Sequence, residues 1–533
     1  MINITEKKNC CGCNACYDAC TKHAITLQTD IEGFSYPYVD KDKCVDCGLC
    51  ERVCPQINIT ELKKNEFAEP VCFAARHKDM EVVFGSTTGG MFSALAQQMY
   101  SEGGYVGGAI YREDWSVAHF ISNNPDDLKR LRQSKYSQSD TRGFYKEVKR
   151  LLIAGEKVLV CGTPCQMAAL RSFLRKDYEN LIIVDFICKS ITSPKFFHKY
   201  LESWERKANS KLVAFKFKDK ELGWRNLTKR FDFKNGKSMY SCNEDDDYYH
   251  TAYHGNLVSR PSCYLCQFKG FPRLADITIA DFWGCERYPK YKSLDENTGT
   301  SAVIVNNFKG LDYFKRIKNI DVMESDINEM IPGNPALVHP QSAPLANREE
   351  FFKDLDEHAI EEVVPKYATL IGQPWNAAPT SKQKIKGFIK AIVKAIRINV
   401  NWYQFMRYNF FCSNVNCNWA KGGFLYPLKY SVIELQKGSI LSLNGPLILG
   451  IKKVKNSPLE TRLLLERSAK LEVNKLARFF YGNDIEVFSG AELLIDRIGT
   501  NANCCIICGK RIRIEGHVSL GRDVSIRDTN AHT

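Results

Sequence analysis

The sequence lacks any long apolar run. No stretch of about 18 or more uninterrupted apolar residues occurs in the chain, so we expect no helix that spans a membrane. The segment Met1 to Cys10 is polar and carries lysines, and it lacks the apolar segment of a secretory signal. We therefore expect a cytoplasmic protein. In that reducing environment, dense cysteines indicate metal ligation or redox chemistry rather than disulfides.

A recognisable nucleic-acid-binding module is also absent. The net charge is +13, and a positive surplus suits an acidic partner, a membrane surface or nucleic acid. Without such a module, we expect no nucleic-acid partner.

The composition changes along the chain and indicates several domains. Residues 1–60 are rich in cysteine, and a charged linker that ends at Pro70 follows them. Residues 71–360 alternate helical patterns with β-rich runs such as Leu181–Phe186, which predicts a mixed α/β domain. Residues 361–430 are basic and helical, and residues 431–533 carry a repeat. The expected fold class is therefore multidomain α+β.

Nine of the 22 cysteines lie among the first 54 residues, and eight of these form a doubled motif. The spacing C-x2-C-x2-C-x3-C occurs at Cys10, Cys13, Cys16 and Cys20, and again at Cys44, Cys47, Cys50 and Cys54. In two-cluster ferredoxins the fourth cysteine of each run ligates the other cluster. This predicts one 4Fe–4S cluster on Cys10, Cys13, Cys16 and Cys54, and a second on Cys44, Cys47, Cys50 and Cys20.

The alternative for the doubled motif is a zinc site. Zinc takes four ligands, so two runs of four cysteines fit it poorly. Cys11 falls outside the spacing and is interpreted as a spare thiol. Residues 1–60 are therefore predicted to be a two-cluster ferredoxin domain.

A glycine-rich loop precedes the helical run from Met91 to Met99. The loop consists of Gly85, Ser86, Thr87, Thr88, Gly89 and Gly90. Glycines let the backbone approach a ligand closely, and free N–H groups at a helix start favour phosphate. A plain capped turn explains the same residues equally well.

Five further motifs follow in order, and together with the loop they carry a resemblance. They are Leu131–Ser139 (LRQSKYSQS), Cys161–Gln166 (CGTPCQ), Asp185–Cys188 (DFIC), Arg260–Cys266 (RPSCYLC) and Asp276–Gly284 (DITIADFWG). In this order they closely resemble the family of coenzyme F-420 hydrogenase and dehydrogenase beta subunits, over roughly residues 1–355. Members of that family are flavoproteins that bind FAD beside an iron–sulfur cluster. The resemblance thus implies electron transfer between cluster, flavin and a hydride carrier or organic substrate.

The resemblance also implies site residues. The loop Gly85–Gly90 would hold the FAD pyrophosphate, with Ser134 and Asp281 also binding the cofactor. Lys135 would be catalytic and stabilise a reduced flavin or a substrate anion, unless it is simply a solvated lysine.

Five cysteines lie inside or beside these motifs and could supply a third 4Fe–4S cluster. They are Cys161, Cys165, Cys188, Cys263 and Cys266. The set assigned is Cys161, Cys188, Cys263 and Cys266. The alternative is that several of the five are buried thiols that pack as small hydrophobic side chains.

The segment Ser381 to Arg407 contains no acidic residue and has the pattern of an amphipathic helix. Lysines and arginines alternate with Phe388, Ile392, Ile396 and other apolar residues. Such a helix could lie on an anionic membrane surface. A linker helix packed on a neighbouring domain, with its lysines in solvent, is the alternative that the pattern favours.

The carboxy-terminal segment has a six-residue period. Ile506, Ile512, Val518 and Val524 recur at this interval, and rougher rungs precede them at Leu441, Leu447, Leu465, Leu471, Ile485, Val487, Leu493 and Ile495. This period predicts a β-helix, and the segment resembles the left-handed β-helix (hexapeptide) acyltransferases. The resemblance implies a homotrimer and a catalytic base at His532. The chain stops at Thr533, so a truncated domain with weak or no acyl transfer is expected.

These features favour an iron–sulfur flavoprotein oxidoreductase that works with a redox partner protein or hydride carrier. An organic or sugar-derived substrate is expected, and relatives fused to sugar-modifying domains look like enzymes of surface-polysaccharide biosynthesis. A sugar O-acyltransferase with a redox-like amino-terminal portion is one alternative. A non-catalytic electron carrier is another.

Overall fold

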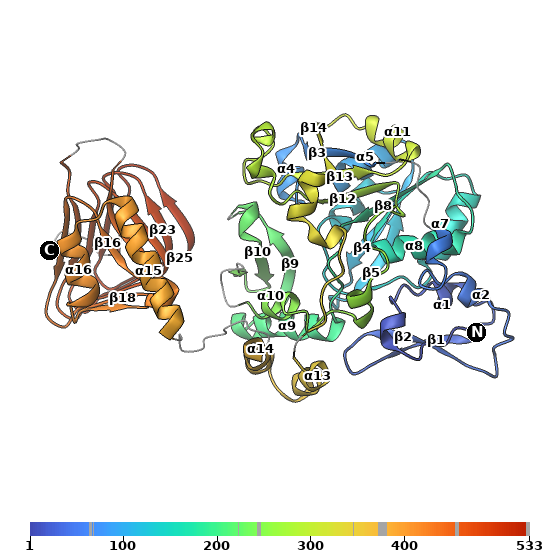
Figure 1. The fold of residues 1–533 in the computed structure, drawn as a ribbon, viewed down its shortest axis with the longest axis horizontal. Helices are drawn as coiled ribbons and strands as arrows, with labels where there is room; N and C mark the ends of the chain where they lie inside the picture. The colour runs from blue at the N-terminus through green and yellow to red at the C-terminus, as the bar shows by residue number, and fades with distance from the viewer. Residues whose placement is uncertain are drawn as a thin grey trace. The chain divides into compact units, whose positions relative to one another are not determined.

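The computed structural model describes residues 1–62, 67, 69–221, 223–241, 247–344, 346–370, 381–452 and 458–528. The chain divides into two compact units, Met1–Asn376 and Ala377–Thr533 (Figure 1). Within the described ranges, no helix is both long and apolar enough to cross a membrane.

A nine-stranded mixed sheet forms the centre of the amino-terminal unit. Its strand order is β14-β3-β13-β12-β8-β7-β4-β5-β6. The strands are β3 (Val71–His77), β4 (Tyr105–Tyr111), β5 (Val117–Ser122), β6 (Ser139–Asp140), β7 (Val158–Gly162), β8 (Leu181–Phe186), β12 (Ile277–Asp281), β13 (Ser301–Val305) and β14 (Ile320–Ser325). The central strands β7, β8 and β13 are almost wholly buried, because helices cover both faces of the sheet. The predicted β-rich runs are therefore confirmed as core strands.

Helices pack on each face of this sheet. Those between β3 and β8 are α4 (Met80–Phe84), α5 (Met91–Ser101), α6 (Leu128–Leu131), α7 (Phe144–Ile153) and α8 (Pro164–Leu174), and α11 (Phe308–Lys315) and α12 (Ile327–Met330) come later. One core joins α5 and α11 to the sheet through residues such as Leu95 and Tyr313. Another core joins α7 and α8 to the opposite face through residues such as Val148 and Leu170. The arrangement is the mixed α/β domain that the sequence predicts.

A second layer of the same unit is built from aromatic side chains. It contains α9 (Pro194–Ala208), β9 (Leu212–Asp219), β10 (Thr228–Phe233), β11 (Ser238–Ser241), α10 (Tyr248–His254), α13 (Arg348–Glu357) and α14 (Ile360–Leu370). Trp204 and Phe231 stack at 4.1 Å in its core. α14 contributes Val364 and Tyr367 to this core, so part of the predicted connector 361–430 packs with the amino-terminal unit.

The cysteine-rich segment folds as a small lobe of the same unit. It comprises α1 (Ala15–Ala19), the antiparallel hairpin of β1 (Ile25–Thr29) and β2 (Ser35–Val39), α2 (Leu49–Arg52) and α3 (Ile59–Leu62). The buried Asp18 carboxylate accepts hydrogen bonds from Gly143 N at 2.6 Å and Tyr145 N at 3.2 Å. These are free N–H groups at the start of α7, where a negative charge is stabilised by the helix dipole. The contact holds the lobe against the α/β body.

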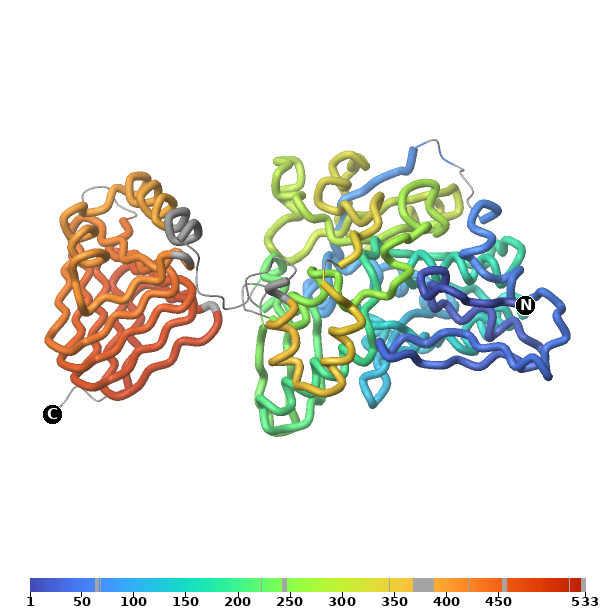
Figure 2. The backbone as a smooth tube through the Cα atoms, turned by 60° about the horizontal axis from the view of Figure 1, so that its bottom comes forward, coloured from blue at the N-terminus to red at the C-terminus, as the bar shows by residue number. Residues whose placement is uncertain are grey.

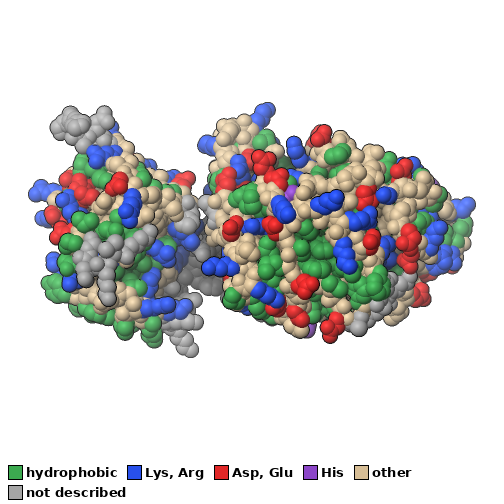
Figure 3. Space-filling view, turned by 90° about the horizontal axis from the view of Figure 1, so that it is seen from above, with side chains coloured by type: hydrophobic (Ala, Val, Ile, Leu, Met, Phe, Trp, Pro, Cys, Tyr) green, Lys and Arg blue, Asp and Glu red, His purple; other side chains and the backbone are tan. Residues whose placement is uncertain are grey.

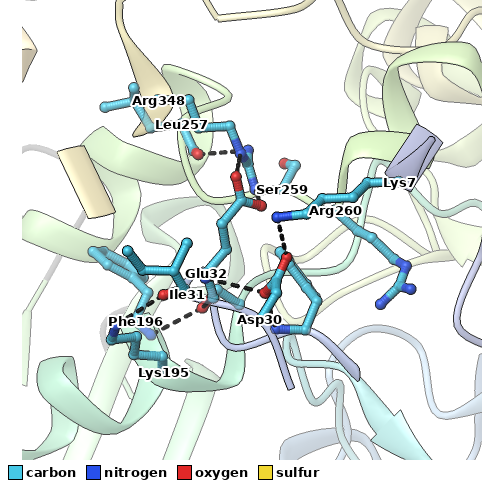
Figure 4. Close-up of polar contacts among 12 residues, drawn as sticks. Lys7, Asp30, Ile31, Glu32, Lys195, Phe196, Leu257, Ser259, Arg260 and Arg348 are labelled. Atoms are coloured by element: carbon cyan, nitrogen blue, oxygen red, sulfur yellow. Dashed lines mark hydrogen bonds and ion pairs between the residues drawn. The ribbon is translucent and has the colours of Figure 1, made fainter. Parts of the chain in front are cut away.

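Charged side chains complete this junction (Figure 4). Arg348 pairs with Glu32 at 2.8 Å and also donates to Leu257 O at 2.6 Å. Lys195 Nζ donates to Ile31 O at 2.8 Å. The loop between β1 and β2 is therefore fixed on α9 and α13 by partly buried contacts.

The carboxy-terminal unit is a parallel stack of strands preceded by two helices. The helices are α15 (Ser381–Ile398) and α16 (Trp402–Phe410). The strands are β15 (Val415–Cys417), β16 (Leu425–Pro427), β17 (Ser431–Leu435), β18 (Ile440–Leu443), β19 (Leu447–Ile451), β20 (Thr461–Leu465), β21 (Lys470–Phe480), β22 (Asp484–Val487), β23 (Glu492–Thr500), β24 (Cys505–Cys508), β25 (Arg511–Leu520) and β26 (Ser525–Arg527).

Every strand pairing described in this stack is parallel and joins residues about one coil apart. Leu471 pairs with Leu493, which pairs with Ile512, and Ile485 pairs with Ile506 in a separate row. Figure 2 shows the successive rungs. The residues picked out by the six-residue period, except Val524, lie in or against one continuous apolar core. The parallel stack is what that period predicts, and the left-handed coil of an acyltransferase stays a prediction.

Candidate electron-transfer and cofactor site

The eight cysteines of the doubled motif gather into two groups of four. Cys20, Cys44, Cys47 and Cys50 line one small cavity. In the other group, burial and then the charges of Cys10 and Cys54 raise the pKa of Cys16. The side chain of Cys11 acts to lower the pKa of Cys13, but burial and the charges of Cys54 and Cys16 together raise it above its usual value. The structure thus brings together the two sets that the spacing predicts, and ligation of clusters by them stays a prediction.

Backbone amides point at thiols of the first of these groups. Ile2 N donates to Cys50 Sγ at 3.2 Å, and Ala24 N donates to Cys20 Sγ at 3.3 Å. Hydrogen bonds of this kind stabilise the thiolates that hold iron–sulfur clusters. The donor set therefore fits a cluster.

A buried arginine joins the second group to the α/β body. The Arg260 side chain has no exposed surface, and its Nε donates to Cys10 O at 2.8 Å. Its Nη1 donates to Gln138 Oε1 at 2.7 Å, and Nη2 lies 3.5 Å from Cys10 Sγ. A Cβ on Gly12, whose φ is +70°, would lie 2.8 Å from the guanidinium carbon. Only glycine allows this close approach at that backbone conformation.

Four cysteines from distant parts of the chain form a third group. Cys165 lies in the first turn of α8, Cys188 follows β8, and Cys263 and Cys266 lie in and just after a 3₁₀ helix, Pro261–Leu265. Burial and then the charges of Cys263, Cys165 and Cys266 raise the pKa of Cys188, so the four thiols are neighbours. Cys11 interacts with both Cys13 and Cys165, so this group adjoins the Cys10 group.

The set assigned from the sequence to a third cluster contains Cys161, whereas the structure places Cys165 beside the other three cysteines. Ligation of a cluster by either residue stays a prediction. Cys161 is the fourth residue of β7, and burial followed by the charge of Asp185 raises its pKa to about 12. Its neighbours are Asp185 and Lys135 rather than the other three cysteines. The chain turns from strand to helix between Cys161 and Cys165, so the two thiols face different surroundings.

A cavity of about 610 Å³ opens beside this third group. Its lining includes most of the residues predicted to bind FAD, namely Ser86, Thr87, Thr88, Gly90, Ser134 and Asp281, and also Lys135, Cys161 and Cys188. Four buried polar atoms of its lining have no partner among the described residues: Ser301 Oγ, His119 Nε2, and Nε2 and Oε1 of Gln341. A cavity with unsatisfied polar groups suits a polar ligand of cofactor size.

The glycine-rich loop forms one wall of the cavity and ends at the start of α5. Gly90 is the N-cap of α5, has φ +85° and makes no side-chain cap, so the free N–H groups face no capping oxygen. Thr87 Oγ1 accepts from Ser134 N at 3.0 Å, which ties the loop to the next motif. Gly85 and Gly89 do not line the cavity. A Cβ on Gly89 would lie 2.6 Å from Ala75 O, so its glycine is required by packing on β3.

Lys135 lines the cavity, but its ammonium is directed elsewhere. Lys135 Nζ donates to the carbonyls of Arg130, Leu131 and Arg132 at 2.8, 3.2 and 2.5 Å, at the carboxyl end of α6. Burial lowers its pKa to about 7. All three hydrogens of the ammonium are therefore in use, and a catalytic role for Lys135 stays a prediction.

Asp281 stands at the carboxyl end of β12 and is held by a buried ion pair. Lys218 Nζ lies 2.5 Å from its carboxylate, and Trp224 Nε1 donates to it at 3.3 Å. Trp224 in turn stacks on Trp283 with a centroid distance of 4.4 Å. These contacts fix Asp281 as a charged, oriented wall of the cavity.

Comparison with protein families matches three stretches of the chain. Residues 72–143 match the amino-terminal model of the coenzyme F420 hydrogenase/dehydrogenase beta subunit, and residues 155–329 match its carboxy-terminal model. Residues 9–57 match a "4Fe-4S dicluster domain". Residues 72–143 and 155–329 are thus similar to the coenzyme F420 hydrogenase/dehydrogenase beta-subunit family, and residues 9–57 are similar to 4Fe–4S dicluster domains. The iron–sulfur part of the prediction is thereby confirmed at the level of the domain.

Curated relatives of this family are distant. One component of the F(420)H(2) dehydrogenase of Methanosarcina mazei is 23% identical over 199 residues, which cover 34% of this chain and 54% of that protein. The coenzyme F420-dependent sulfite reductase of Methanocaldococcus jannaschii is 27% identical over 190 residues, covering 34% of this chain and 27% of that protein. The chain therefore spans about half or less of the length of these relatives.

An uncharacterised ferredoxin of Methanocaldococcus jannaschii is 33% identical over 67 residues, covering 12% of this chain and 86% of that protein. Among solved structures, a chain of the F420-reducing [NiFe] hydrogenase complex from Methanosarcina barkeri is 18% identical, with a TM-score of 0.34. The likeness covers 58% of this chain and 93% of that chain.

Sequence reasoning did not single out Arg260 or His119, and it left Cys165 out of the assigned set although Cys165 was one of its five candidates. Cys165 and Arg260 lie inside the quoted motifs, but spacing alone does not show which cysteines meet or that Arg260 is buried between them. His119 carries no motif signal, and only its orphaned Nε2 marks it. The remaining catalytic prediction, His532, lies outside the described residues.

Proposed function

We propose that this protein is an iron–sulfur flavoprotein oxidoreductase that passes electrons between 4Fe–4S clusters, FAD and a hydride carrier or organic substrate. The observation that carries the proposal is the order of its thiol groups. The Cys44 group lies outermost, the Cys10 group follows, and the Cys165 group joins the Cys10 group through Cys11. Cys188 of the last group also lines the 610 Å³ cavity. A chain of redox sites that ends at a cofactor cavity suits electron transfer.

The Cys165 group fits a third 4Fe–4S cluster. Its four thiols lie together, as the four iron corners of a cube require, and Lys269 stands near Cys188 as a compensating charge. Cys165, Cys188, Cys263 and Cys266 would hold this cluster, and the two predicted quartets would hold the others.

The cavity fits FAD by its size, its orphaned polar atoms and its charge. Arg132 lines it beside the free amides at the start of α5, where a pyrophosphate would be stabilised. Arg132 Nε donates to Ser93 Oγ at 2.9 Å, which orients the guanidinium. Bound FAD would exchange single electrons with clusters and electron pairs with a carrier such as coenzyme F420, which two of the relatives' names contain.

Anaerobic purification with a matched pair of cysteine variants tests the proposal. We expect about twelve irons, matching sulfide and one FAD per chain. Cys165→Ser should lose about four irons, whereas Cys161→Ser should keep them all, because only Cys165 lies with the other three thiols. Equal iron content in both variants would contradict the third cluster. A colourless protein without FAD would contradict the flavin.

We also infer that the carboxy-terminal unit is a left-handed β-helix of the acyltransferase type that assembles the chain into a homotrimer. The parallel stack with its continuous apolar core supports this inference. An acyl acceptor on a sugar would place the protein in surface-polysaccharide biosynthesis, with sugar O-acyl transfer as the second candidate activity. Turnover of acetyl-coenzyme A that is lost in His532→Ala would favour that second activity.

A further inference from the structure

Seven large apolar side chains are exposed within a short stretch of the carboxy-terminal unit. They are Ile389 (56%), Val393 (59%), Ile396 (63%), Trp402 (41%), Tyr403 (73%), Met406 (41%) and Phe411 (79%). Single exposed apolar residues are common on proteins, but a cluster of this size marks an interaction surface. We call these seven residues the apolar face.

The apolar face is the outer surface of two helices whose inner surfaces are already buried. Ala391 and Ala395 of α15 and Phe405 of α16 belong to one core with Phe424 and Tyr426 of the strand region. Ile389, Val393 and Ile396 follow one another at intervals of three or four residues, so they share one side of α15. Because the opposite side is fixed in the core, α15 cannot rotate to hide them. The helix is thus packed on its own unit and exposes a second apolar stripe.

The charge in the sequence that carries the apolar face has one sign. Residues 377–433 contain no Asp or Glu. The same stretch contains Lys382, Lys384, Lys386, Lys390, Lys394, Arg397, Arg407, Lys421 and Lys429. Lys390, Arg397 and Arg407 are exposed beside the apolar residues. On the visible faces of both units, Asp and Glu are interspersed with Lys and Arg (Figure 3), so the lack of acidic residues is particular to this stretch of the sequence.

We propose that the apolar face binds the surface of an anionic lipid membrane. Aliphatic side chains would enter the acyl boundary, Trp402 and Tyr403 would occupy the headgroup level, and the flanking cations would meet anionic lipid. A symmetric contact with a second copy would instead bring two copies of this acid-free, cationic stretch together, which is unfavourable. The helices lie on the membrane in this arrangement and do not cross it.

Sedimentation of the full chain with lipid vesicles tests this surface. Vesicles of phosphatidylcholine alone are compared with vesicles that contain about one third phosphatidylglycerol. We expect binding to the anionic vesicles only, and we expect it to weaken as salt screens the cations. The double variant Val393→Asp/Ile396→Asp should reduce binding by about tenfold or more, because two carboxylates enter the apolar stripe.

Val213→Asp is the matched control, since Val213 is 57% exposed on β9 of the other unit. It adds a similar carboxylate away from the apolar face and should leave vesicle binding unchanged. Light scattering of each variant without lipid measures its oligomeric state. This shows whether the apolar face contacts a second copy of the chain instead of a membrane. The proposal would be overturned if the full chain did not bind anionic vesicles, or if Val213→Asp lost as much vesicle binding as the double variant. It would also be overturned if the double variant formed a smaller assembly but bound vesicles as before.

Discussion

Arg260 holds a positive charge inside the protein beside a predicted cluster ligand. Its guanidinium contacts Cys10 O, Ser35 O and the side chain of Gln138, and it stacks on Tyr36 at 4.2 Å. A buried cation favours the more negative, reduced state of a nearby cluster. We therefore infer that Arg260 raises the reduction potential of the cluster on the Cys10 group.

Arg260→Met should lower that potential by about 60 mV, which is about 1.4 kcal/mol for one electron. Potentiometric titration followed by electron paramagnetic resonance would measure it. Arg348→Met is the control, because Arg348 also joins the lobe to the body but pairs with Glu32 rather than with a cysteine. A similar shift in both variants would mean that the effect is loosening of the junction. Arg260→Lys should restore part of the potential.

The buried charge of Asp247 makes the stability of the fold depend on pH. Burial acts to raise the pKa of Asp247, but Lys229 at 3.1 Å and the hydroxyls of Tyr200 and Ser241 hold it below its usual value. The ionised carboxylate therefore adds stability that is present above its unfolded pKa of about 3.9 and is lost as the pH falls through the lower, folded value.

Asp247→Asn should cost about 3 kcal/mol at neutral pH, because Lys229 is left buried without its partner. Asparagine keeps the N-cap of α10, so the loss reports the charge. Asp232→Asn, in a more exposed pair with Arg230, should cost at most about 1 kcal/mol. Urea unfolding midpoints would show the difference, and it should shrink on acidification. Equal costs in the two variants would contradict this.

At the scale of elements, the position of the glycine-rich loop could be predicted from its sequence, but the role of one of its glycines could not. The loop was expected to precede a helix, and α5 begins directly after Gly90. Glycine is required at position 89 for a reason other than the expected one. The absence of a side chain makes room for Ala75 and Ser301 of two strands rather than for a ligand. Such a contact depends on strands far away in the chain, which a local pattern does not reveal.

The loop can therefore be tested only at a position that lines the cavity. Thr87→Glu places a carboxylate beside the expected pyrophosphate, whereas Thr87→Gln has a similar size and no charge. Both lose the hydrogen bond from Ser134 N. We expect Thr87→Glu to weaken FAD binding by about tenfold or more relative to Thr87→Gln, measured by flavin fluorescence during dilution. Equal affinities of the two variants for FAD would mean that the pyrophosphate does not bind beside Thr87.

The cysteines show the same limit of sequence reasoning. The eight of the doubled motif could be grouped from spacing, because each run folds into one short loop. Cys161 and Cys165 could not be told apart, since the chain crosses from β7 into α8 between them and places them in two different environments. Local periodicity was also sufficient for the rows of the carboxy-terminal stack, but the charge of Arg260 next to Cys10 becomes visible only when residues 250 apart meet.

At the scale of the whole molecule, the carboxy-terminal unit leads to a prediction about assembly. The left-handed β-helix that we propose for this unit implies a trimer, so light scattering of the full chain should give three times the mass of one chain. Truncation after Asn376 should give a monomer. The cut is placed there because α15 and α16 share a core with β16 through Phe405 and Tyr426, so removing the strands alone would expose that core.

The truncated chain also keeps all three cysteine groups and the cavity. Its iron and flavin content should therefore match the full chain, because no residue of that site lies beyond Asn376. This makes cofactor content an internal control for folding. A full-length monomer would contradict the trimer. A truncated trimer would move the contact to the amino-terminal unit, and loss of cofactors from the truncated chain would show that the second unit stabilises the first.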